Sequence, residues 1–354
     1  MRVGLIIYGP LSTMSGGFLY DRKLVEHLRE SGDEVEVISL PWHGYPRLLA
    51  HNFSRGLRRR IAGLGLDLLL QDELNHPSLF RMNGALKGLP IVSIVHHLRS
   101  KEAHSRWTNQ VYRRIEARYL SSVDAFVFNS RTTRSDVADA IGDMKPHVVA
   151  YPGGDRLNPK ITPLQVIRRA SAAGPLRLLF IGNLIPRKGL HTLVSALAIS
   201  GPGWRLDVVG PDTDASYASK VRALVSEKGL SDRVTFRGAL GDEALAGLLE
   251  ESHVLAVPSS YEGFGIVYME GMGFGLPALG TSSGAASETI RHGVNGFLTP
   301  PDDVAGLSQH VTRLIQDRTL LSEMGQAALA AYAAHPTWEQ SGETIRRFLL
   351  KIAR

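Results

Sequence analysis

The segment Glu262-Gly-Phe-Gly-Ile-Val-Tyr-Met-Glu270 predicts a tight loop that leads into a helix. The apolar run Val254-Leu-Ala-Val257 comes before it and predicts a buried strand. One carboxylate therefore lies on the loop and the other inside the helix. Gly263 and Gly265 allow the backbone to approach a ligand closely, and the helix start behind them directs unpaired amides toward an anion. The alternative interpretation is an ordinary turn with two solvated glutamates.

A second strand, loop and helix lie earlier in the chain, and the loop between them carries two adjacent cations. The run Leu176–Ile181 predicts a strand, Gly182-Asn-Leu-Ile-Pro-Arg-Lys-Gly189 a loop, and Leu190–Ile199 a helix. Arg187 offers a planar fork and Lys188 a compact charge, and both suit phosphate oxygens. Alone, such a pair is usually a solvated turn. Ligand-binding loops of alternating strands and helices gather at the carboxyl ends of the strands, so two such motifs in one array favour a binding site.

The amino terminus repeats the same order of elements. Arg2–Tyr8 predicts a buried strand, and Phe18–Ser31 has helical spacing of its apolar residues. Gly16 and Gly17, at the start of that helix, can bring backbone amides against a phosphate. The Gly-x-Gly-x-x-Gly spacing of dinucleotide-binding sites is absent. On its own, this loop would be interpreted as a plain turn.

These motifs together resemble the retaining glycosyltransferases of family 4. The resemblance rests on the Glu262/Glu270 pair with Glu-x7-Glu spacing, Arg187-Lys-Gly189, the Gly16-Gly17 loop and the Gly293-Val-Asn-Gly-Phe297 turn. It covers nearly the whole chain and is strongest from residue 176 to residue 303. It implies an α/β protein with the GT-B fold, in which two Rossmann-like parallel-sheet domains face a central cleft.

The pattern of elements predicts two such domains. Strands are expected near residues 3, 35, 67, 91 and 125, and again near residues 177, 206, 234, 253 and 277, with helices between them. Residues 1–157 form the expected acceptor-side domain and residues 175–334 the nucleotide-sugar-binding domain. Prolines 159, 163 and 175 favour residues 158–174 as the linker. The resemblance implies that a final helix within residues 335–354 returns to the N-terminal domain.

The resemblance also implies roles for individual residues. Glu270 would hold the ribose hydroxyls and Glu262 a hydroxyl of the donor sugar, while Arg187 and Lys188 would meet the diphosphate. Asn183 departs from the family pattern, because many relatives carry arginine at this position. The complete expected donor-binding set, besides Glu270, is Gly16, Gly17, Asn183, Gly263, Phe264, Gly265, Ile266 and Val267.

A histidine completes the expected catalytic set of His96, Glu262, Lys188 and Arg187. His96 directly follows the predicted strand Ile91–Val95, with His97 as the alternative. The resemblance implies that a histidine at this strand end contacts the donor sugar or its phosphate, and a histidine held by backbone is the other interpretation. No side chain stands out as a general base. In the family, the departing phosphate oxygen is expected to accept the proton of the acceptor.

Composition excludes several classes of protein. With 354 residues, 44% of them hydrophobic and 21% charged, the chain suits a two-domain globular enzyme. It has no cysteine, and its 13 histidines show no metal-ligand spacing, so we expect neither a metal site nor a cofactor. No apolar run approaches the roughly 18–20 residues of a membrane span. We therefore expect a cytoplasmic protein.

The net charge of +6 is concentrated in the first half of the chain. Residues 1–157 hold 21 Lys and Arg against 16 Asp and Glu, and the remainder holds 19 against 18. A solvated helix face is one explanation; attraction to an anionic acceptor or to lipid at the inner membrane face is the other. No nucleic-acid-binding module is present, so nucleic acid is not an expected partner. The basic residues are Arg55, Arg58, Arg59 and Arg60, and Arg106, Arg113, Arg114 and Arg118.

The function expected from these motifs is transfer of a hexose from a UDP, GDP or ADP sugar to an acceptor, with retention and without a metal. A lipid, a glycan and a small alcohol all remain open as acceptors, because acceptor loops are irregular. Two alternatives keep the same fold. One is a sugar-nucleotide epimerase, which needs no acceptor, and the other is a non-catalytic subunit that binds sugar nucleotides.

Overall fold

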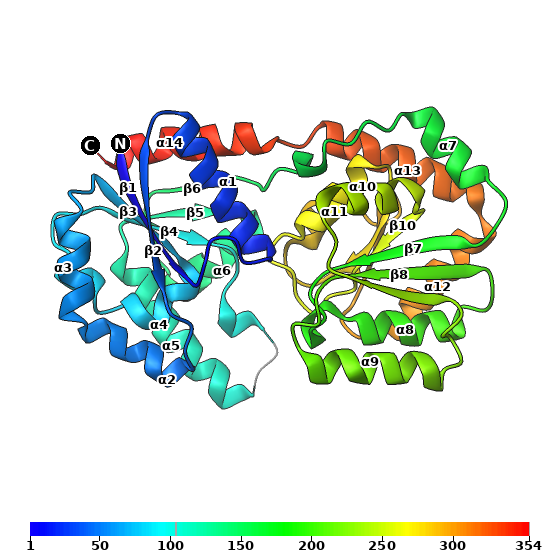
Figure 1. The fold of residues 1–354 in the computed structure, drawn as a ribbon, viewed down its shortest axis with the longest axis horizontal. Coiled ribbons are helices and arrows are strands. Elements are labelled where there is room, and N and C mark those ends of the chain that lie inside the picture. Colours follow the sequence, from blue (N-terminus) through cyan, green and yellow to red (C-terminus); the bar gives the residue numbers. More distant parts are fainter. Residues whose placement is uncertain (103–104, 354) are drawn as a thin grey trace. The chain divides into compact units, whose positions relative to one another are not determined.

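The computed structural model describes residues 1–102 and 105–353 and divides them into two compact units (Figure 1). Unit one comprises Met1–Pro152 together with the chain from Pro336 onward, and unit two comprises Gly153–His335. Each unit is built on a parallel six-stranded sheet with helices on both faces. The expected α/β class with two Rossmann-like domains is therefore confirmed.

The sheet of unit one has the strand order β2-β1-β3-β4-β5-β6, and every neighbouring pair is parallel. Its strands are β1 (Arg2–Tyr8), β2 (Glu34–Leu40), β3 (Leu68–Asp72), β4 (Ile91–Val95), β5 (Ala125–Phe128) and β6 (His147–Val149). Its helices are α1 (Gly16–Glu30), α2 (Tyr45–Leu48), α3 (Arg55–Gly63), α4 (His76–Leu79), α5 (Arg106–Ser122), α6 (Arg131–Ile141) and α14 (Trp338–Ile352).

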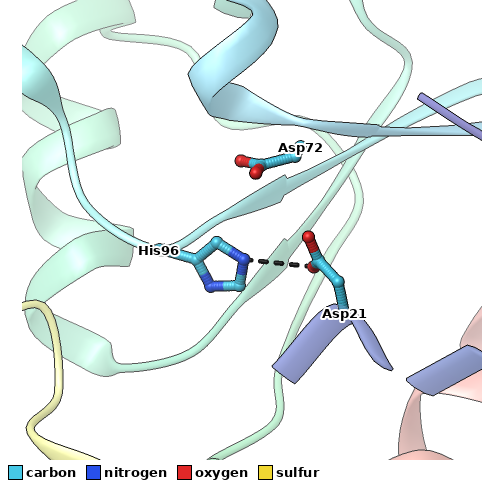
Figure 2. Close-up of side chains that lie close together, drawn as sticks. All are labelled: Asp21, Asp72 and His96. Atoms are coloured by element: carbon cyan, nitrogen blue, oxygen red, sulfur yellow. Dashed lines mark hydrogen bonds and ion pairs between the residues drawn. The ribbon is translucent and has the colours of Figure 1, made fainter. Parts of the chain in front are cut away.

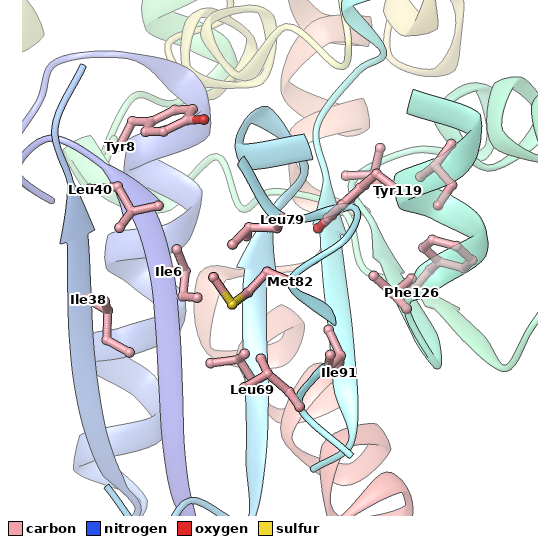
Figure 3. Close-up of a cluster of buried hydrophobic side chains, with 14 of the residues drawn as sticks. Ile6, Tyr8, Ile38, Leu40, Leu69, Leu79, Met82, Ile91, Tyr119 and Phe126 are labelled. Carbon is pink, nitrogen blue, oxygen red and sulfur yellow. The ribbon is translucent and has the colours of Figure 1, made fainter. Parts of the chain in front are cut away.

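The main core of unit one lies between this sheet and helices α2 to α6. Strands β3, β4 and β5 are buried at every position, as expected for parallel strands covered on both faces. Figure 3 shows Ile6, Leu69 and Ile91 of the sheet beside Leu79 and Met82 from the covering segments. Helices α1 and α14 pack on each other against the opposite face. This rigid sheet positions the loops that leave its carboxyl edge.

The sheet of unit two has the order β12-β11-β10-β7-β8-β9, again with parallel neighbours. Its strands are β7 (Leu176–Ile181), β8 (Trp204–Val209), β9 (Val234–Gly238), β10 (Val254–Ala256), β11 (Ala278–Thr281) and β12 (Gly296–Thr299). Its helices are α7 (Pro163–Ser171), α8 (Leu190–Ile199), α9 (Ala215–Glu227), α10 (Asp242–Glu251), α11 (Ile266–Gly273), α12 (Val304–Gln316) and α13 (Arg318–Ala333). Helices α8, α9 and α12 cover one face, and α10, α11 and α13 the other.

The segment expected to be a linker, residues 158–174, is instead largely helical and part of unit two. Helix α7 packs on α13 and buries Val166 and Ala170. The prolines favour a linker in the sequence, but Pro163 occupies the first turn of α7, where its missing N–H costs nothing. Thr162 closes a capping box in front of it. The first segment of unit one ends at Pro152, five residues before the predicted boundary at residue 157.

The last helix, α14, belongs to unit one. It packs on α1 and β6 and buries Trp338, Ile345 and Leu349. The Nε of Arg346 also lies 2.7 Å from Oδ2 of the buried Asp33. The predicted end of this segment, Arg354, lies outside the described residues.

Candidate functional site

Glu262 lies on the loop that follows β10, and this loop is held by its own backbone. The carbonyl oxygen of Glu262 accepts a hydrogen bond from the amide of Ala285 at 2.8 Å. The side chain is only 5% exposed, and its Oε1 accepts from Oγ of Ser259 at 2.7 Å. The same oxygen forms an ion pair with Nζ of Lys188. The structure thus brings together two residues that the sequence placed in separate loops.

Arg187 and Lys188 lie in a short 3-10 turn, Pro186–Lys188, between β7 and α8. The amide of Ser260 donates to the carbonyl of Arg187 at 2.8 Å, and Nη1 of Arg187 donates to the carbonyl of Tyr261 at 3.0 Å. A Cβ on Gly189 would lie 2.0 Å from the carbonyl oxygen of Pro258. Glycine is therefore required at Gly189 for the two loops to approach so closely.

Neighbouring charges determine the protonation of Glu262 and shift the pKa of Lys188. Burial alone would raise the pKa of Glu262, but the positive charges of Lys188 and Arg187, with hydrogen bonds from Lys188 and Ser259, lower it to about 2. Burial lowers the pKa of Lys188, and the attraction of Glu262 opposes that shift. Glu262 is consequently ionised at neutral pH and can accept hydrogen bonds only.

Glu270 lies inside α11 and is 2% exposed. Its Oε1 accepts a hydrogen bond from Nε of Arg156 at 2.7 Å, and Arg156 also forms an ion pair with Asp242. Arg156 was not predicted as part of the site, since it lies in the isolated turn Asp155–Leu157. Only the fold brings this turn to α11.

Helix α11 begins directly after the glycine loop Gly263–Gly265. Gly265 adopts φ +84° immediately before the helix, and a Cβ there would lie 2.4 Å from the ring of Tyr268. Ile266 and Val267 are the first two residues of α11, and the first amides of a helix have no intrahelical partner. Such amides, together with the positive end of the helix dipole, form an anion-binding surface. Gly263 and Phe264 complete the loop, and the Phe264 ring stacks on His335.

Asn183 lies in the loop after β7, four residues before Arg187. Its carbonyl oxygen accepts from the amide of Ile185 at 2.9 Å, and Gly182 before it is held by the carbonyl of Val209. The loop is therefore ordered by backbone contacts. In unit two, the predicted set thus lies on three segments: the loop after β7, the loop after β10 and helix α11.

The predicted residues of unit one form a separate group at the carboxyl end of β4. Gly16 and Gly17 are the first residues of α1, which Ser15 caps, so the helix begins two residues before its predicted start. A Cβ on Gly17 would lie 3.1 Å from Cδ2 of His96, so this glycine and this histidine are in contact. Nε2 of His97 instead bonds Oε1 of Glu102 at 2.9 Å.

His96 has an acidic surrounding that the sequence did not reveal. Figure 2 shows its ring beside Asp21 of α1, with Asp72 from the end of β3 above them in this view. Nε2 of His96 lies 3.1 Å from Oδ1 of Asp21. Burial alone would lower the pKa of His96, but Asp21, and then Asp72 and Glu73, raise it to about 9. The imidazole is therefore protonated at neutral pH.

Two groups of histidine and carboxylates converge in unit one. One is Asp21, Asp72 and His96; the other is Glu73, His76 and Glu116. Within each group the candidate ligand atoms lie within 4.8 Å of one another, close enough for a divalent cation to reach all three. Sequence spacing missed both groups, because their members come from different elements of the sheet and its helices.

The predicted basic residues on α3 are exposed, as are those on α5. Trp107 on α5 is 74% exposed, and Phe53 just before α3 is 69% exposed. Among the described residues, no helix has both the length and the apolar character needed to cross a membrane. The basic helices thus combine positive charge with exposed aromatic side chains.

Two family models match the chain. "Glycosyl transferase 4-like domain" matches residues 18–154, and "Glycosyl transferases group 1" matches residues 166–330. A GDP-mannose-dependent alpha-(1-6)-phosphatidylinositol monomannoside mannosyltransferase from Mycobacterium tuberculosis is 29% identical over 252 residues, which cover 68% of this chain. The alignment spans 65% of that enzyme's own length, less than two thirds of it.

Two solved structures have the same fold. A sucrose-phosphate synthase from Thermosynechococcus elongatus has a TM-score of 0.86 at 21% identity and covers 99% of this chain and 98% of its own. Anabaena HepE, solved with UDP-glucose, has a TM-score of 0.80 at 22% identity and covers 99% of this chain and 100% of its own. The two family models follow the order of the two units and together match most of the chain, and we conclude that it belongs to the family 4 glycosyltransferases with the GT-B fold.

Proposed function

We propose that this protein transfers a hexose from a nucleoside-diphosphate sugar to an acceptor with retention of the anomeric configuration. The observation that carries the proposal is the contact of Lys188 with Glu262, whose loop leads into the start of α11. A cation, a buried ionised carboxylate and unpaired amides are the groups needed for a phosphate next to sugar hydroxyls. Family membership supports the same reaction class.

Each group has a proposed partner on the donor. Lys188, Arg187 and the amides of Ile266 and Val267 would bind the diphosphate, with the Gly16-Gly17 loop as a further source of amides. Glu262 would accept from a hexose hydroxyl. Glu270 would accept from the ribose, through the oxygen that Arg156 does not occupy. His96 would contact the donor sugar or its phosphate.

The reaction is proposed to need no metal. Cleavage of the sugar–diphosphate bond leaves negative charge on phosphate, and fixed cations and amides in the site would stabilise that charge. Such preorganised donors are usually the largest catalytic term, and removing one typically costs about 10²–10³ in rate. The departing phosphate oxygen would accept the proton of the acceptor, so no general base is assigned.

The base of the donor is proposed to be uridine or guanosine, with adenosine as the third option. The mannosyltransferase relative is named for GDP-mannose, and the HepE structure contains UDP-glucose. The acceptor is proposed to be a lipid-linked glycan, a glycan or a small alcohol. The basic helix α3 and the exposed Trp107 support an acceptor at an anionic membrane surface, and so a peripheral location there.

The test combines donor binding with product analysis. Thermal shifts with UDP, GDP and ADP identify the base, because a ligand at about 100 times its Kd stabilises the folded state by roughly 2.7 kcal/mol. The donor sugar of that base is then incubated with and without candidate acceptors, in EDTA and in Mg²⁺. We expect a glycosylated product with unchanged anomeric configuration and equal rates in EDTA.

The variants Lys188→Ala and Glu270→Ala are expected to lose transfer while remaining folded at the assay temperature. Lys188→Ala should also lower the unfolding temperature, because it leaves the buried Glu262 carboxylate without its cation. Lys228→Ala, an exposed lysine of the same unit, is the control and should keep full activity. Wild-type transfer in Lys188→Ala or Glu270→Ala would refute the assignment. Conversion of the donor alone would identify an epimerase, and binding without transfer or hydrolysis a non-catalytic subunit.

A further inference from the structure

Unit two has an open pocket of about 520 Å³ at the amino-terminal edge of its sheet, where α7 leads into β7 (Figure 1). All strands of this sheet are parallel, so the loops that carry Lys188 and Glu262 lie at the opposite, carboxyl-terminal edge. The pocket is therefore separate from the proposed donor site. Its charged lining residues are Lys160, Arg169, Arg177, Glu250 and Glu251.

Arg177, the second residue of β7, brings a guanidinium into this pocket without a carboxylate partner. Its side chain forms no ion pair with any described residue, and its Nε is shielded from solvent and has no hydrogen-bond partner there. Only its backbone amide is engaged, by Nδ1 of His253 at 2.8 Å. A shielded, charged donor without a partner is costly, so a ligand that pairs with it would be stabilising.

Two further arginines add positive charge around Arg177. Burial, and then the charge of Arg177, lower the pKa of Arg318 at the start of α13. The same two causes lower the pKa of Arg169 to about 10, although Glu250 opposes the shift. Nη1 of Arg318 is also shielded and has no hydrogen-bond partner in the described part of the chain. Such mutual repulsion indicates a positive local potential, which attracts anions.

The other groups near Arg177 are occupied by backbone. Nη1 of Arg169 donates to the carbonyl of Glu250 at 2.9 Å, and its Nη2 donates to the carbonyl of Phe274 at 2.8 Å. Nε2 of His253 lies 3.0 Å from the carbonyl of Arg169, so both ring nitrogens of His253 contact backbone. Burial and the three arginines lower the pKa of His253 to about 4, so its ring is neutral. Arg177 is thus the guanidinium available to a ligand.

The two acids of the pocket lie at the end of α10. Glu250 and Glu251 are exposed, and neither forms an ion pair with Arg169 or Arg177 within the described ranges. They do not neutralise the arginines directly. Ionised carboxylates only accept hydrogen bonds, so they suit a ligand with hydroxyl groups better than a bare anion.

We propose that this pocket binds a small phosphate monoester that carries hydroxyl groups, such as a sugar phosphate. The phosphate would pair with the fork of Arg177, and the hydroxyls would donate to Glu250 and Glu251. Arginine holds phosphate by two parallel N–H···O bonds. The volume lies within the roughly 300–1,000 Å³ of small-molecule sites. This site is additional to the proposed donor site and does not depend on the proposed function.

Calorimetry on the full chain at low salt tests the role of Arg177, with inorganic phosphate, glucose 1-phosphate and glucose as the probes. Both phosphates should bind and glucose should not. Arg177→Gln should weaken the binding of both phosphates about tenfold or more, since a charged hydrogen-bonding partner is lost. Lys220→Gln, which removes an exposed charge on α9, is the control and should keep the wild-type affinities. Unchanged affinities in Arg177→Gln overturn the proposal.

A second comparison separates this pocket from the donor site. Lys188→Ala removes the cation that is proposed to meet the donor diphosphate, and it should keep the glucose 1-phosphate affinity within about twofold. Loss of binding in Lys188→Ala together with full binding in Arg177→Gln would place the phosphate at the donor loops and refute the pocket.

The acids predict opposite effects on the two phosphates. In the wild type, glucose 1-phosphate should bind at least about threefold more tightly than inorganic phosphate, because only the sugar offers hydroxyls. The double variant Glu250→Gln with Glu251→Gln should bind inorganic phosphate more tightly, since two negative charges are gone, and should lose most of that preference. A preference unchanged in the double variant contradicts the role assigned to the acids.

Thermal unfolding distinguishes a ligand-binding arginine from a structural one. Without phosphate, Arg177→Gln should be at least as stable as the wild type, because repulsion from Arg169 and Arg318 is relieved. Inorganic phosphate at about ten times its Kd should shift the unfolding equilibrium of the wild type about elevenfold, and that of Arg177→Gln about twofold. Arg177→Lys keeps the charge without the fork; it should show an intermediate shift, and it serves if Arg177→Gln does not fold. A destabilised Arg177→Gln with the full phosphate response would show a structural role and overturn the proposal.

Discussion

Arg156 and Glu270 form an ion pair inside unit two, with Nε of Arg156 2.7 Å from Oε1 of Glu270. Glu270 is almost fully buried, and Arg156 is 20% exposed. Glu270 is the residue proposed to hold the ribose, and one of its two carboxylate oxygens is therefore already bonded to Arg156. Burial would lower the pKa of Arg156, but Glu270 and then Asp242 raise it above its ordinary value, so the guanidinium keeps its charge.

Arg156→Ala is expected to destabilise the protein by about 3–5 kcal/mol, because it leaves a buried carboxylate without its cation. Adding Glu270→Gln to this variant should recover much of the loss, since a neutral amide is cheaper to bury. Asp242→Asn removes only the exposed partner and should cost at most about 1 kcal/mol. Urea unfolding measures all three, and a double variant no more stable than Arg156→Ala contradicts this account.

Glu262 should contribute to acid sensitivity. Its folded pKa of about 2 lies below its ordinary value of 4.5, so its contribution is fully present above pH 4.5 and is lost as the pH falls toward 2. The predicted loss is roughly 3 kcal/mol at most. The unfolding free energy should fall more between pH 5 and pH 3 in the wild type than in Glu262→Gln, because the glutamine amide does not titrate.

The matched control for this experiment is Ser259→Ala. It removes one hydrogen bond to Glu262 and leaves the carboxylate and Lys188 in place. It should therefore lose stability at both pH values and keep most of the difference between them. Equal pH dependence in Glu262→Gln and the wild type would exclude Glu262 as the group responsible.

Gly265→Ala should reveal how tightly the loop before α11 is built. The left-handed backbone at φ +84° costs a non-glycine residue about 1–2 kcal/mol, and the added Cβ also meets the Tyr268 ring at 2.4 Å. Gly293→Ala has nearly the same backbone, φ +77°, with nothing within 4 Å of its Cβ. Thermal unfolding and nucleotide titration should show a larger loss for Gly265→Ala in both measurements; equal losses would rule out a role for Tyr268.

The raised pKa of Glu73 predicts that the free energy of unfolding falls in alkaline solution. Burial raises its pKa to about 8, although His96 and Arg99 oppose the shift. The folded pKa exceeds the ordinary value of 4.5, so the contribution is full below pH 4.5 and is lost as the pH rises through 8. Glu73→Gln should be more stable than the wild type at pH 9. The control Glu36→Gln, at a half-exposed carboxylate, should behave as the wild type at both pH 6 and pH 9.

The basic helix α3 gives a prediction about lipid. Phosphatidylglycerol vesicles should bind the protein at low salt and release it at high salt, since each arginine near an anionic surface adds about 1 kcal/mol. Replacing Arg55, Arg58, Arg59 and Arg60 with glutamine should abolish sedimentation with the vesicles. Glutamine at Lys220, Arg222, Lys228 and Arg237 of unit two is the control for total charge. Equal loss in the two variants would refute a specific role for α3.

The alternation of apolar runs predicted the parallel sheets well, because buried parallel strands such as Ile91–Val95 are apolar throughout. It missed β12, where Gly296 and Thr299 dilute the apolar signal and a turn motif overlaps the strand. It also missed α7, because the prolines favoured a linker over residues 158–174, whereas Pro163 is the first residue of the helix.

For the candidate site, local spacing identified the residues that share a loop, such as Glu262 and Gly265. It did not identify Asp21, Asp72 or Arg156, because each joins the site only through tertiary contact. Asp21 falls on a helix face that also carries buried apolar residues, and a lone acid there gives no local signal. The roles of the predicted residues remain predictions until the variants above are measured.

Unit one is assembled from both ends of the chain, since α14 packs on α1 after the whole of Gly153–His335 has intervened. During synthesis, α1 and β6 leave the ribosome long before Trp338, Ile345 and Leu349 of α14 are made. Until the last residues emerge, the nascent first unit must carry an uncovered apolar strip on α1 and β6. Unit two is one continuous segment, so its folding does not depend on α14. A chain truncated before α14 would leave the apolar strip of unit one open to chaperones and to aggregation.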